Sequence, residues 1–333
     1  MGNNVNRGWA AIGALVAGTS ALVGCSGPQS TLDPAGRGAA RIAELFWGMT
    51  AGAVAIWAAM IGLALYTVAR RRTEPSPRAP ALLIVGGGVV LPIVVLTGLL
   101  AWGLAALPPL LAASDSDRTI VVTGEQFWWR VRYLVPGGEA VELANELRLP
   151  VGEAVELQLE SRDVIHSFWV PALGGKVDMI PGRRTRLTLE PTRTGVFRGV
   201  CAEYCGTSHA RMAFAVVVSD EQEFARWLAQ QAEPARPATE PLAVRGQELF
   251  VRSGCGACHT VRGTVADGVI APNLTHVGGR LSVGAGLLAS EPDGFQHWIA
   301  APERLKPGSA MPSFAMLPAD DLQALAAYLE GLE

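Results

Sequence analysis

Two long apolar stretches lie in the first third of the chain. Residues 45–69 contain no charged side chain between Glu44 and Arg70, and residues 79–113 form a second run without charge. A helix of about 20 apolar residues spans the ~30 Å hydrocarbon layer of a membrane. The pattern therefore predicts two transmembrane helices, at about residues 45–69 and 81–107. It disfavours two buried helices of a soluble protein, because the runs are too long for that.

The loop between these stretches is basic. Its sequence RRRTEPSPR contains Arg70, Arg71, Arg72 and Arg78. Positively charged loops of membrane proteins stay in the cytoplasm. We therefore expect a transmembrane hairpin with a cytoplasmic loop, so that the N-terminus and everything after residue 114 face the outer side.

The first 24 residues have the layout of an export signal. A single charge, Arg7, precedes an apolar run that ends in small residues, as in secretory signal peptides. The segment Leu22-Val23-Gly24-Cys25 is similar to the cleavage box of bacterial lipoproteins, in which the cysteine becomes the lipidated N-terminus. We expect a signal peptide at residues 1–24 and lipidation of Cys25. A third transmembrane helix with an incidental cysteine is the alternative.

Beyond the second apolar stretch the pattern changes to short β-type segments. Segments such as TIVVTGEQFWWRVRYLV, AVELQLES and MAFAVVVS alternate with proline- and glycine-rich turns over residues 118–219. This spacing predicts a β-sandwich. We place it at residues 115–230, after an N-terminal and membrane segment at 25–114. In this arrangement His166 ends one strand, and the loop at 201–212 joins the last two strands.

A proline-rich segment follows the predicted sandwich. The sequence QAEPARPATEP at residues 231–241 predicts a semi-stiff linker. The pattern over residues 242–333 is mostly helical, and Asp320 and Asp321 suit the N-terminus of its last helix, where negative charge is favourable. The expected fold class is a multidomain membrane protein with a two-helix transmembrane hairpin, a β-sandwich and an all-α C-terminal domain.

Composition narrows the class of protein further. Half of the 333 residues are hydrophobic, which agrees with membrane spans. The formal net charge is only −3, from 27 basic and 30 acidic residues, so no nucleic-acid partner is indicated. Apart from Cys25, the cysteines form two close pairs, Cys201/Cys205 and Cys255/Cys258. In an exported protein a disulfide is the default expectation for each pair.

The first cysteine pair lies among other soft metal donors. The pattern C-x-E-x-C-x-x-x-H-x-x-M contains Cys201, Glu203, Cys205, His209 and Met212, and His166 lies upstream on another strand. Thiolate, imidazole and thioether together select copper or another soft transition metal. A disulfide leaves the histidines and the methionine unexplained, and a mononuclear copper site needs only one cysteine. Two thiolates in one loop favour a binuclear copper centre that carries electrons.

The second cysteine pair matches a haem attachment motif. The sequence Cys255-Gly256-Ala257-Cys258-His259 is the C-x-x-C-H pattern, in which two thiols bind haem c covalently and the histidine ligates the iron. A disulfide or a redox dithiol would not explain the adjacent histidine. The pattern therefore predicts haem c in the C-terminal domain.

The second axial ligand of the iron is expected further downstream, and Met311 and Met316 are the candidates. Residues 242–333 resemble a class I cytochrome c domain, which carries its axial methionine in an x-Met-Pro context before the C-terminal helix. The resemblance implies Met311 as the ligand and Pro272 next to His259. We expect Met316 to be a core residue. His276 and His297 are expected to be packing or surface residues.

The β-sandwich region resembles the CuA domain of subunit II of haem–copper cytochrome c oxidases. The matching motifs are DVIHSFWVPALGGKVDMIPGR at residues 163–183 and CAEYCGTSHARM at residues 201–212. The two transmembrane helices match the topology of that family, and a fused cytochrome c domain occurs in one variety of it. The resemblance implies a cupredoxin-like sandwich that holds the binuclear copper centre called CuA.

The resemblance also implies a role for each donor. Cys201 and Cys205 would bridge the two coppers, and His166 and His209 would each bind one of them. Met212 would be a weak ligand, and the backbone carbonyl of Glu203 would complete the set. In that family the carboxylate at the position of Glu203 also reaches a magnesium or manganese ion at the interface with the catalytic subunit.

The sequence departs from the family at two places. A tryptophan that passes electrons to copper usually follows Gly-x-Gln, but Phe127 stands there, with Trp128 and Trp129 next. All three are candidates for electron transfer, and the two tryptophans could instead be core residues of a strand. Many members also carry an acidic residue near the start of the second helix. Residues 81–92 contain none, and Glu74 is the nearest carboxylate, so the route of proton uptake stays open.

These features together predict a membrane-anchored subunit that receives electrons for an aerobic terminal oxidase. Electrons would pass from a cytochrome c or another respiratory donor through haem c and CuA to a catalytic subunit I, which reduces dioxygen with proton pumping. The expected place is the bacterial inner membrane, with both redox domains on the outer face. The alternatives are the equivalent subunit of a CuA-containing nitric-oxide reductase and a free-standing copper-binding lipoprotein.

Overall fold

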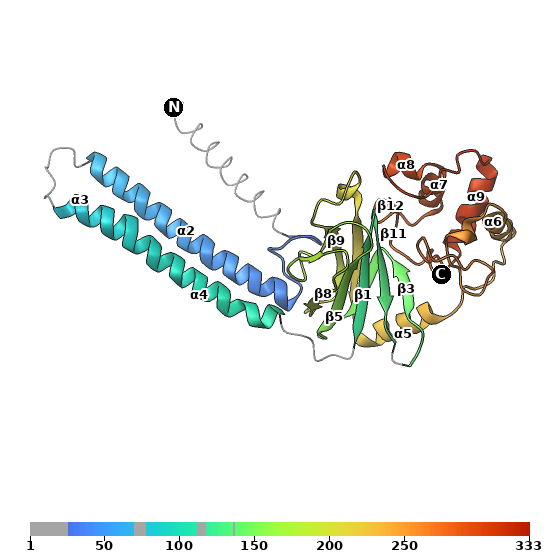
Figure 1. The fold of residues 1–333 in the computed structure, drawn as a ribbon, viewed down its shortest axis with the longest axis horizontal. Helices are drawn as coiled ribbons and strands as arrows, with labels where there is room; N and C mark the ends of the chain where they lie inside the picture. Colours follow the sequence, from blue (N-terminus) through green and yellow to red (C-terminus); the bar gives the residue numbers. More distant parts are fainter. Residues whose placement is uncertain (1–25, 70–77, 112–117, 136) are drawn as a thin grey trace, which may run out of the picture. The chain divides into compact units, whose positions relative to one another are not determined.

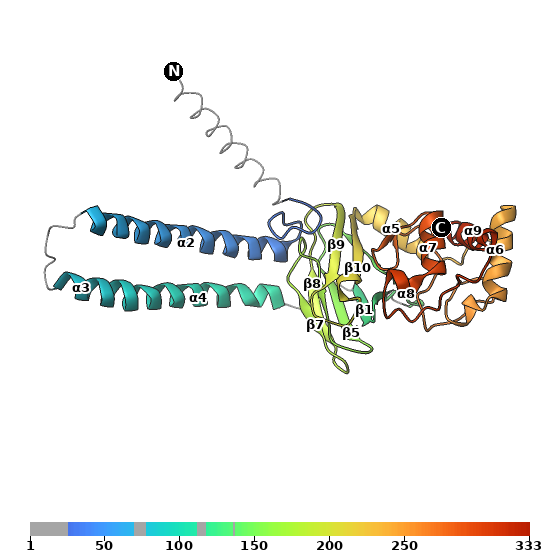
Figure 2. The same cartoon turned by 90° about the horizontal axis from the view of Figure 1, so that it is seen from above.

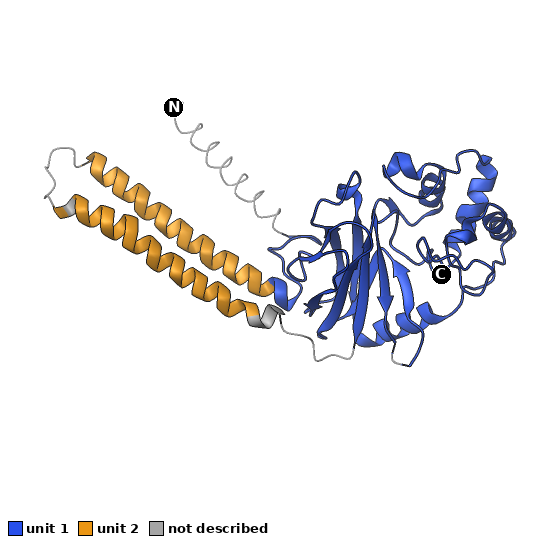
Figure 3. Ribbon diagram, viewed as in Figure 1, with its two compact units in different colours: residues 1–39, 114–333 blue, residues 40–113 orange. Residues whose placement is uncertain are grey.

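The computed structural model describes residues 26–69, 78–111, 118–135 and 137–333 (Figure 1). The expected signal peptide, Cys25 and Glu74 lie outside the described residues, as do three of the four loop arginines. The contacts divide the chain into two compact units only, residues 40–113 and the remainder (Figure 3). The finer domain limits expected from the sequence therefore stay predictions.

The smaller unit is a pair of apolar helices. Helix α2 is Arg37–Ala69, and the second helix consists of α3 (Arg78–Leu82), a π-helical segment η1 (Leu83–Val90) and α4 (Leu91–Leu111). Both views show α2 and α4 side by side (Figures 1 and 2). Segments Arg37–Ala69 and Pro80–Leu107 are long and apolar enough to cross a membrane, and the most apolar 18-residue stretch of each contains no buried residue. They include both stretches expected to be transmembrane.

Gly48 explains how closely the two apolar helices approach. A Cβ atom at this position would lie 2.3 Å from the ring of Trp102 on α4. Only glycine leaves room for that ring, and small residues of this kind are typical of helix contacts in membranes.

The larger unit begins with a sandwich of two five-stranded sheets. The strand orders are β3-β2-β1-β5-β8 and β4-β10-β9-β6-β7. The strands are β1 Thr119–Glu125, β2 Trp128–Tyr133, β3 Val141–Ala144, β4 Glu146–Pro150, β5 Val155–Ser161, β6 His166–Trp169, β7 Val177–Met179, β8 Thr185–Leu189, β9 Gly195–Cys201 and β10 Ala213–Ser219. The fold class expected for this region is confirmed.

Alternation along the strands explains the sandwich. In β5, Val155, Leu157 and Leu159 are fully buried, and the residues between them are less so. This period of two places one face of a strand in the core. The prediction that His166 ends a strand is wrong, because His166 is the first residue of β6 and pairs with Met179 of β7. The turn Ser-Arg-Asp-Val at residues 161–164 therefore leads into His166 and positions it.

The C-terminal part is mostly helical, as expected. Its elements are α6 Pro241–Arg252, the 3-10 turn η3 Cys255–Ala257, α7 Pro292–Ala300, α8 Pro302–Leu305 and α9 Ala319–Glu330, with a short hairpin of β11 (Ser282–Val283) and β12 (Leu288–Ala289). The preceding helix α5 (Glu221–Ala232) packs instead on the sandwich, whose core includes Phe224. Gly246 lets α6 cross α9 closely, since a Cβ atom there would lie 2.0 Å from the Ala324 carbonyl oxygen. A second apolar core, separate from that of the sandwich, lies among these helices.

The sandwich and the helical part contact each other within this unit. Arg130 of β2 donates from Nη2 to the carbonyl of Val269 at 3.1 Å, and the Leu281 amide donates to the Glu146 carboxylate at 2.9 Å. The Ala213 amide donates to the carbonyl of Ala285 at 3.3 Å. These bonds attach one end of the sandwich to segments that flank the haem motif.

Candidate copper and haem sites

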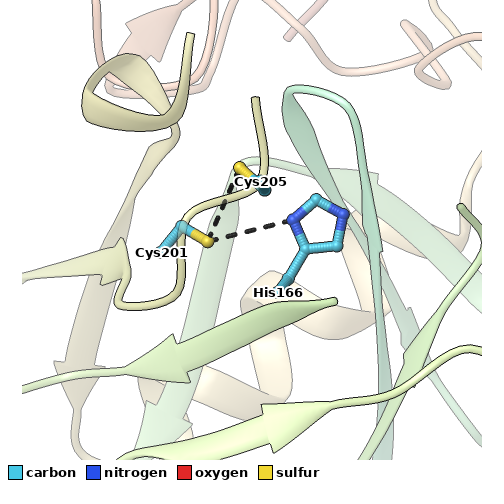
Figure 4. Close-up of side chains that lie close together, drawn as sticks. All are labelled: His166, Cys201 and Cys205. Carbon is cyan, nitrogen blue, oxygen red and sulfur yellow. Dashed lines mark hydrogen bonds between the residues drawn. The ribbon is translucent and has the colours of Figure 1, made fainter. Parts of the chain in front are cut away.

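The copper donors gather at one end of the sandwich. Cys201 Sγ lies 3.8 Å from Cys205 Sγ and 3.8 Å from His166 Nδ1, and all three side chains point toward one another (Figure 4). Cys205 Sγ lies 3.6 Å from His209 Nδ1 and 3.8 Å from Met212 Sδ. A disulfide bond is about 2 Å long, so the two sulfurs are not bonded. The structure brings together five of the predicted donors.

Burial separates these donors from water. His166, Cys201, Cys205 and Met212 are all buried. Within the described parts of the chain, the first three form the one group of His, Cys, Asp and Glu whose ligand atoms lie within 4.8 Å of one another. Buried thiols and imidazole without carboxylates fit a soft transition metal and do not fit calcium or magnesium. The residues present therefore fit copper.

The pKa values of the two thiols shift in opposite directions. The hydrogen bond from Cys205, supported by one from His166, lowers the pKa of Cys201 to about 3 against the opposing effect of burial. The same hydrogen bond, together with burial, raises the pKa of Cys205. Because a metal binds cysteine as thiolate, metal binding favours the deprotonated form of both side chains, and the raised pKa of Cys205 makes this binding pH-dependent.

Asp163 orients the His166 ring, and the sequence interpretation missed it. Its Oδ1 lies 2.8 Å from His166 Nε2 and accepts from the Val164 amide at 2.7 Å, while Oδ2 accepts from the Gln126 amide at 2.7 Å. Burial opposes a charge on His166, but its contacts with Cys201 and Asp163 outweigh that effect and raise its pKa. With Nε2 bonded to the carboxylate, Nδ1 faces the sulfurs. This is the usual outer support of a metal-binding histidine.

A close backbone approach also fixes His166. A Cβ atom at Gly124 would lie 2.8 Å from the His166 ring, so glycine is required where β1 passes the site. The Gln126 side chain donates from Nε2 to the Cys205 carbonyl at 2.5 Å. The turn after β1 therefore supports both His166 and the loop that carries the cysteines.

The backbone carbonyl and the side-chain carboxylate of Glu203 make different contacts. Its backbone carbonyl oxygen lies 3.2 Å from Cys201 Sγ, so it faces the sulfurs, as the predicted copper ligand would. Its carboxylate accepts from the Tyr204 amide at 3.2 Å. Across the residues that the structure describes, this carboxylate belongs to no cluster of potential ligands. The magnesium or manganese ion therefore gains no support and stays a prediction.

The haem motif borders a mostly apolar cavity of about 270 Å³. Cys255, Cys258 and His259 line it, and neither cysteine is in a disulfide. His259 Nδ1 lies 2.7 Å from the Pro272 carbonyl oxygen, as the resemblance predicts, so this nitrogen carries the proton and Nε2 is left for a metal. Burial lowers the pKa of His259 and keeps the imidazole neutral. The site fits a covalently bound haem.

Met311 is the methionine that lines this cavity. Met316 is 76% exposed, so the expectation that it is a core residue is wrong. It follows Ala315 in the loop before α9 and faces solvent. His276 is buried against the Glu233 carbonyl at 2.9 Å, and His297 is exposed, as expected of packing and surface residues.

The three aromatic candidates differ in position. Phe127 and Trp128 line the haem cavity although they belong to the sandwich. The Phe127 ring lies close to the backbone of Gly206 in the copper loop and of Gly308 before Met311, since a Cβ atom at either glycine would come within 3.0 Å of it. Trp129 is fully buried in the core of the sandwich.

Trp129 packs against Phe168 and Phe214, with ring centroids 5.8 and 5.1 Å away. Trp128 instead stacks under the Arg130 guanidinium at 4.7 Å, which fixes its ring beside the cavity. The two neighbours in sequence therefore point to opposite faces of β2. The core interpretation fits Trp129, and the position between the two sites fits Phe127 and Trp128.

We predict that Asp163→Asn weakens copper binding about 10- to 100-fold, the usual cost of losing an outer partner of a ligand. Asparagine has one acceptor oxygen, and its amide group would face a backbone N–H that the carboxylate now accepts from. Competition with a copper chelator measures the change. Asp320→Asn, at an exposed position on α9, is the control. Equal affinity in the two variants would contradict the role of Asp163.

We predict that Met311→Ala removes the sulfur–iron charge-transfer band of oxidised haem c while the covalently bound haem remains. Met316→Ala, a matched change at an exposed methionine, should leave the band intact. Optical spectra of the two purified variants provide the measurement. Survival of the band in Met311→Ala would show that another residue binds the iron.

Comparison with known proteins supports both sites. The chain matches the family model for cytochrome C oxidase subunit II, periplasmic domain, over residues 133–219 and the model for cytochrome c over residues 243–333. The sandwich therefore lies outside the cytoplasm. A solved structure of the periplasmic domain of subunit II of cytochrome oxidase (CoxB) of Bradyrhizobium japonicum is 34% identical and covers 37% of this chain and 96% of that chain, with a TM-score of 0.34.

Two curated relatives are both named cytochrome c oxidase subunit 2. The protein of Alkalihalophilus pseudofirmus is 38% identical over 219 residues, and that of Bacillus sp. (strain PS3) is 32% identical over 243 residues. The alignments cover 66% and 68% of this chain, and 62% and 67% of the relatives. The chain thus spans about two thirds of their length.

The expectations drawn from the motifs are confirmed at the level of fold, family and cofactors, which are copper in the sandwich and haem c in the helical part. The protein belongs to the cytochrome c oxidase subunit 2 family and carries a cytochrome c domain after its copper-binding domain.

Proposed function

We propose that this chain receives electrons from a respiratory donor and passes them to the catalytic subunit of an aerobic terminal oxidase. They would travel through haem c at Cys255, Cys258 and His259 and then through a CuA centre in the sandwich. The observation that carries the proposal is the direct contact between the loop that holds the copper donors and the loop that precedes Met311.

Three side chains of the copper loop bond to that second loop. Thr207 Oγ1 and Ser208 Oγ donate to the carbonyl of Pro307 at 3.0 and 2.6 Å, and Arg211 donates to the carbonyl of Leu305. Electron transfer through protein slows steeply with distance. Loops that are hydrogen-bonded to each other keep the two candidate sites close, which supports a direct step between them.

Phe127 supports the same route. It lies between the copper loop and the Met311 loop, and it replaces the tryptophan that members of the family usually have at this point. The side chain that elsewhere serves a diffusing donor would here serve a haem on the same chain. Trp128 lines the same cavity and is the second candidate on this route.

The copper donors lie at strand ends and in one loop of the sandwich. We assign His166, Cys201, Cys205, His209, Met212 and the carbonyl of Glu203 to the copper centre, and His259 and Met311 to the haem iron. Each group, when bound, takes up and releases one electron at a time. Loops on a stiff sandwich hold the donors in nearly one geometry in both redox states, which lowers the reorganisation energy.

The covalent link between the two domains favours transfer within one molecule. A tether of ordinary length gives an effective concentration of roughly mM, and the bonds described above then select one docked arrangement. The donor that reduces haem c would therefore not need to reach the copper site. A cytochrome c or another respiratory donor fits this role.

We also propose the partners and the location. The two apolar helices would anchor the chain in the inner membrane of a bacterium, with the basic loop in the cytoplasm and a haem–copper subunit I beside them. Cys25 would carry a lipid as a further anchor. Because the relatives are cytochrome c oxidase subunits, an oxidase is favoured over a nitric-oxide reductase or a free-standing copper lipoprotein.

We predict two copper ions for each covalently bound haem c in the complex purified in mild detergent. Its oxidised electron paramagnetic resonance spectrum should show one electron shared by two equivalent copper nuclei. Cys205→Ser should abolish that signal and keep haem c, while the matched change Cys258→Ser should impair haem attachment and keep the copper signal.

One copper ion per haem c, or the spectrum of a single copper nucleus, would contradict the binuclear assignment. A chain that purifies with no haem–copper subunit and no oxygen consumption would contradict the role in an oxidase. Consumption of nitric oxide instead of oxygen would favour the reductase.

A further inference from the structure

Two cations are buried beside the haem cavity. Lys306 is only 3% exposed and Arg280 only 8% exposed, and both line the cavity that Cys255 and Cys258 also line. Lysine and arginine are almost never buried unless they are paired with an anion. The two residues therefore require a partner.

No carboxylate of the described residues forms an ion pair with either cation. Lys306 Nζ donates to the Gly284 carbonyl at 2.8 Å. Arg280 donates from Nη2 to the Asn273 carbonyl, and its Nε has no hydrogen-bond partner. An ammonium has three donors, so the Gly284 carbonyl leaves most of the donor capacity of Lys306 unused. Arg280 feels the charges of Glu146 and Glu142, although neither carboxylate pairs with it directly.

The pKa values of both side chains are lowered, as expected for buried cations without a paired anion. Burial lowers the pKa of Lys306 to about 7 and that of Arg280 to about 10. An uncompensated buried charge is costly, whereas an anion at hydrogen-bond distance restores the charged form. Both cations thus stand where an anion would stabilise the folded chain.

Haem c supplies such anions. If the proposed attachment at Cys255 and Cys258 is correct, the cavity holds a porphyrin with two carboxylate side chains. A carboxylate held inside this cavity would need hydrogen-bond donors, and Lys306 and Arg280 are the Lys and Arg residues that line it.

Lys306 differs from Arg280 in how it is held. It stands between Leu305 and Pro307, whose carbonyls accept hydrogen bonds from Arg211, Thr207 and Ser208 of the copper loop. The backbone of Lys306 is therefore fixed by the copper side, while its side chain borders the haem side.

We propose that Lys306 binds a carboxylate of haem c and is a positioning residue that raises the haem c reduction potential. This inference rests on the proposed attachment of haem c. The lysine charge balances the carboxylate, so its removal leaves a negative charge beside the iron and favours the oxidised, more positive state. Because the copper loop holds Lys306, the docked sandwich contributes to the potential of the haem that it accepts electrons from.

The test compares Lys306→Gln with Lys176→Gln in the complete oxidase complex. Lys176 is the only other lysine of the sequence, and it is half exposed on the sandwich beside Asp178. The haem c midpoint potential is measured by redox titration followed optically. Lys306→Gln should lower the equilibrium constant for haem c reduction roughly tenfold, which for one electron is about 59 mV. Lys176→Gln should leave it unchanged, and Lys306→Arg should restore most of it.

Equal potentials in the two glutamine variants would overturn the inference. Haem staining of the denatured chain separates this outcome from a failure of the proposed function. A wild-type chain without covalent haem would contradict the proposed function. Covalent haem c with an unchanged potential in Lys306→Gln would contradict only the role of Lys306. If Lys306→Gln loses haem, a structure of the wild-type holo complex decides. Nζ within about 3 Å of a haem carboxylate oxygen supports the inference, and Nζ bonded to Gly284 alone overturns it.

Discussion

The hydrogen bonds from the copper loop to the carbonyls of Leu305 and Pro307 are the contacts on which the rest of the account depends. Each bond contributes only about 1 kcal/mol, so these contacts fix orientation more than they add stability. The Arg130 bond to Val269 and the Phe127 ring close the same interface. Together they hold two sites from different domains at the short separation that electron transfer requires.

Rigidity on the copper side has identifiable sources. Cys201 ends β9, Met212 precedes β10 and His166 begins β6, so three neighbouring strands of one sheet fix these donors. Asp163 and Gly124 then orient the imidazole from outside the site. The chain thus supplies a preformed set of soft donors, held by the strands and by outer hydrogen bonds.

The sequence predicted a functional feature best where its residues lie close together along the chain. The cysteine, histidine and methionine spacings predicted both metal sites, and uncharged runs of 25 residues or more predicted the two apolar helices. It failed for residues whose role depends on contacts between distant parts of the chain. Asp163 is an ordinary carboxylate in the sequence, and Met316 looks like a core residue. Nothing in the residue pattern shows that Phe127 and Trp128 line the haem cavity whereas Trp129 does not.

Lys306 is the clearest case of that limit. Lysine is mostly exposed in proteins, yet Lys306 is buried beside the β11–β12 hairpin, where its ammonium donates to the Gly284 carbonyl. Docking of the two domains makes them one compact unit. The functional arrangement therefore depends on a contact between segments about 100 residues apart, which no local motif encodes.

The most direct test of the central claim is the rate at which haem c reduces copper in the purified complex, measured after rapid photoreduction at several protein concentrations and salt concentrations. A docked pair predicts a rate that stays constant on dilution and changes little with salt, because no encounter between separate charged surfaces is involved. A rate that falls in proportion to protein concentration would contradict the account, since electrons would then pass between molecules.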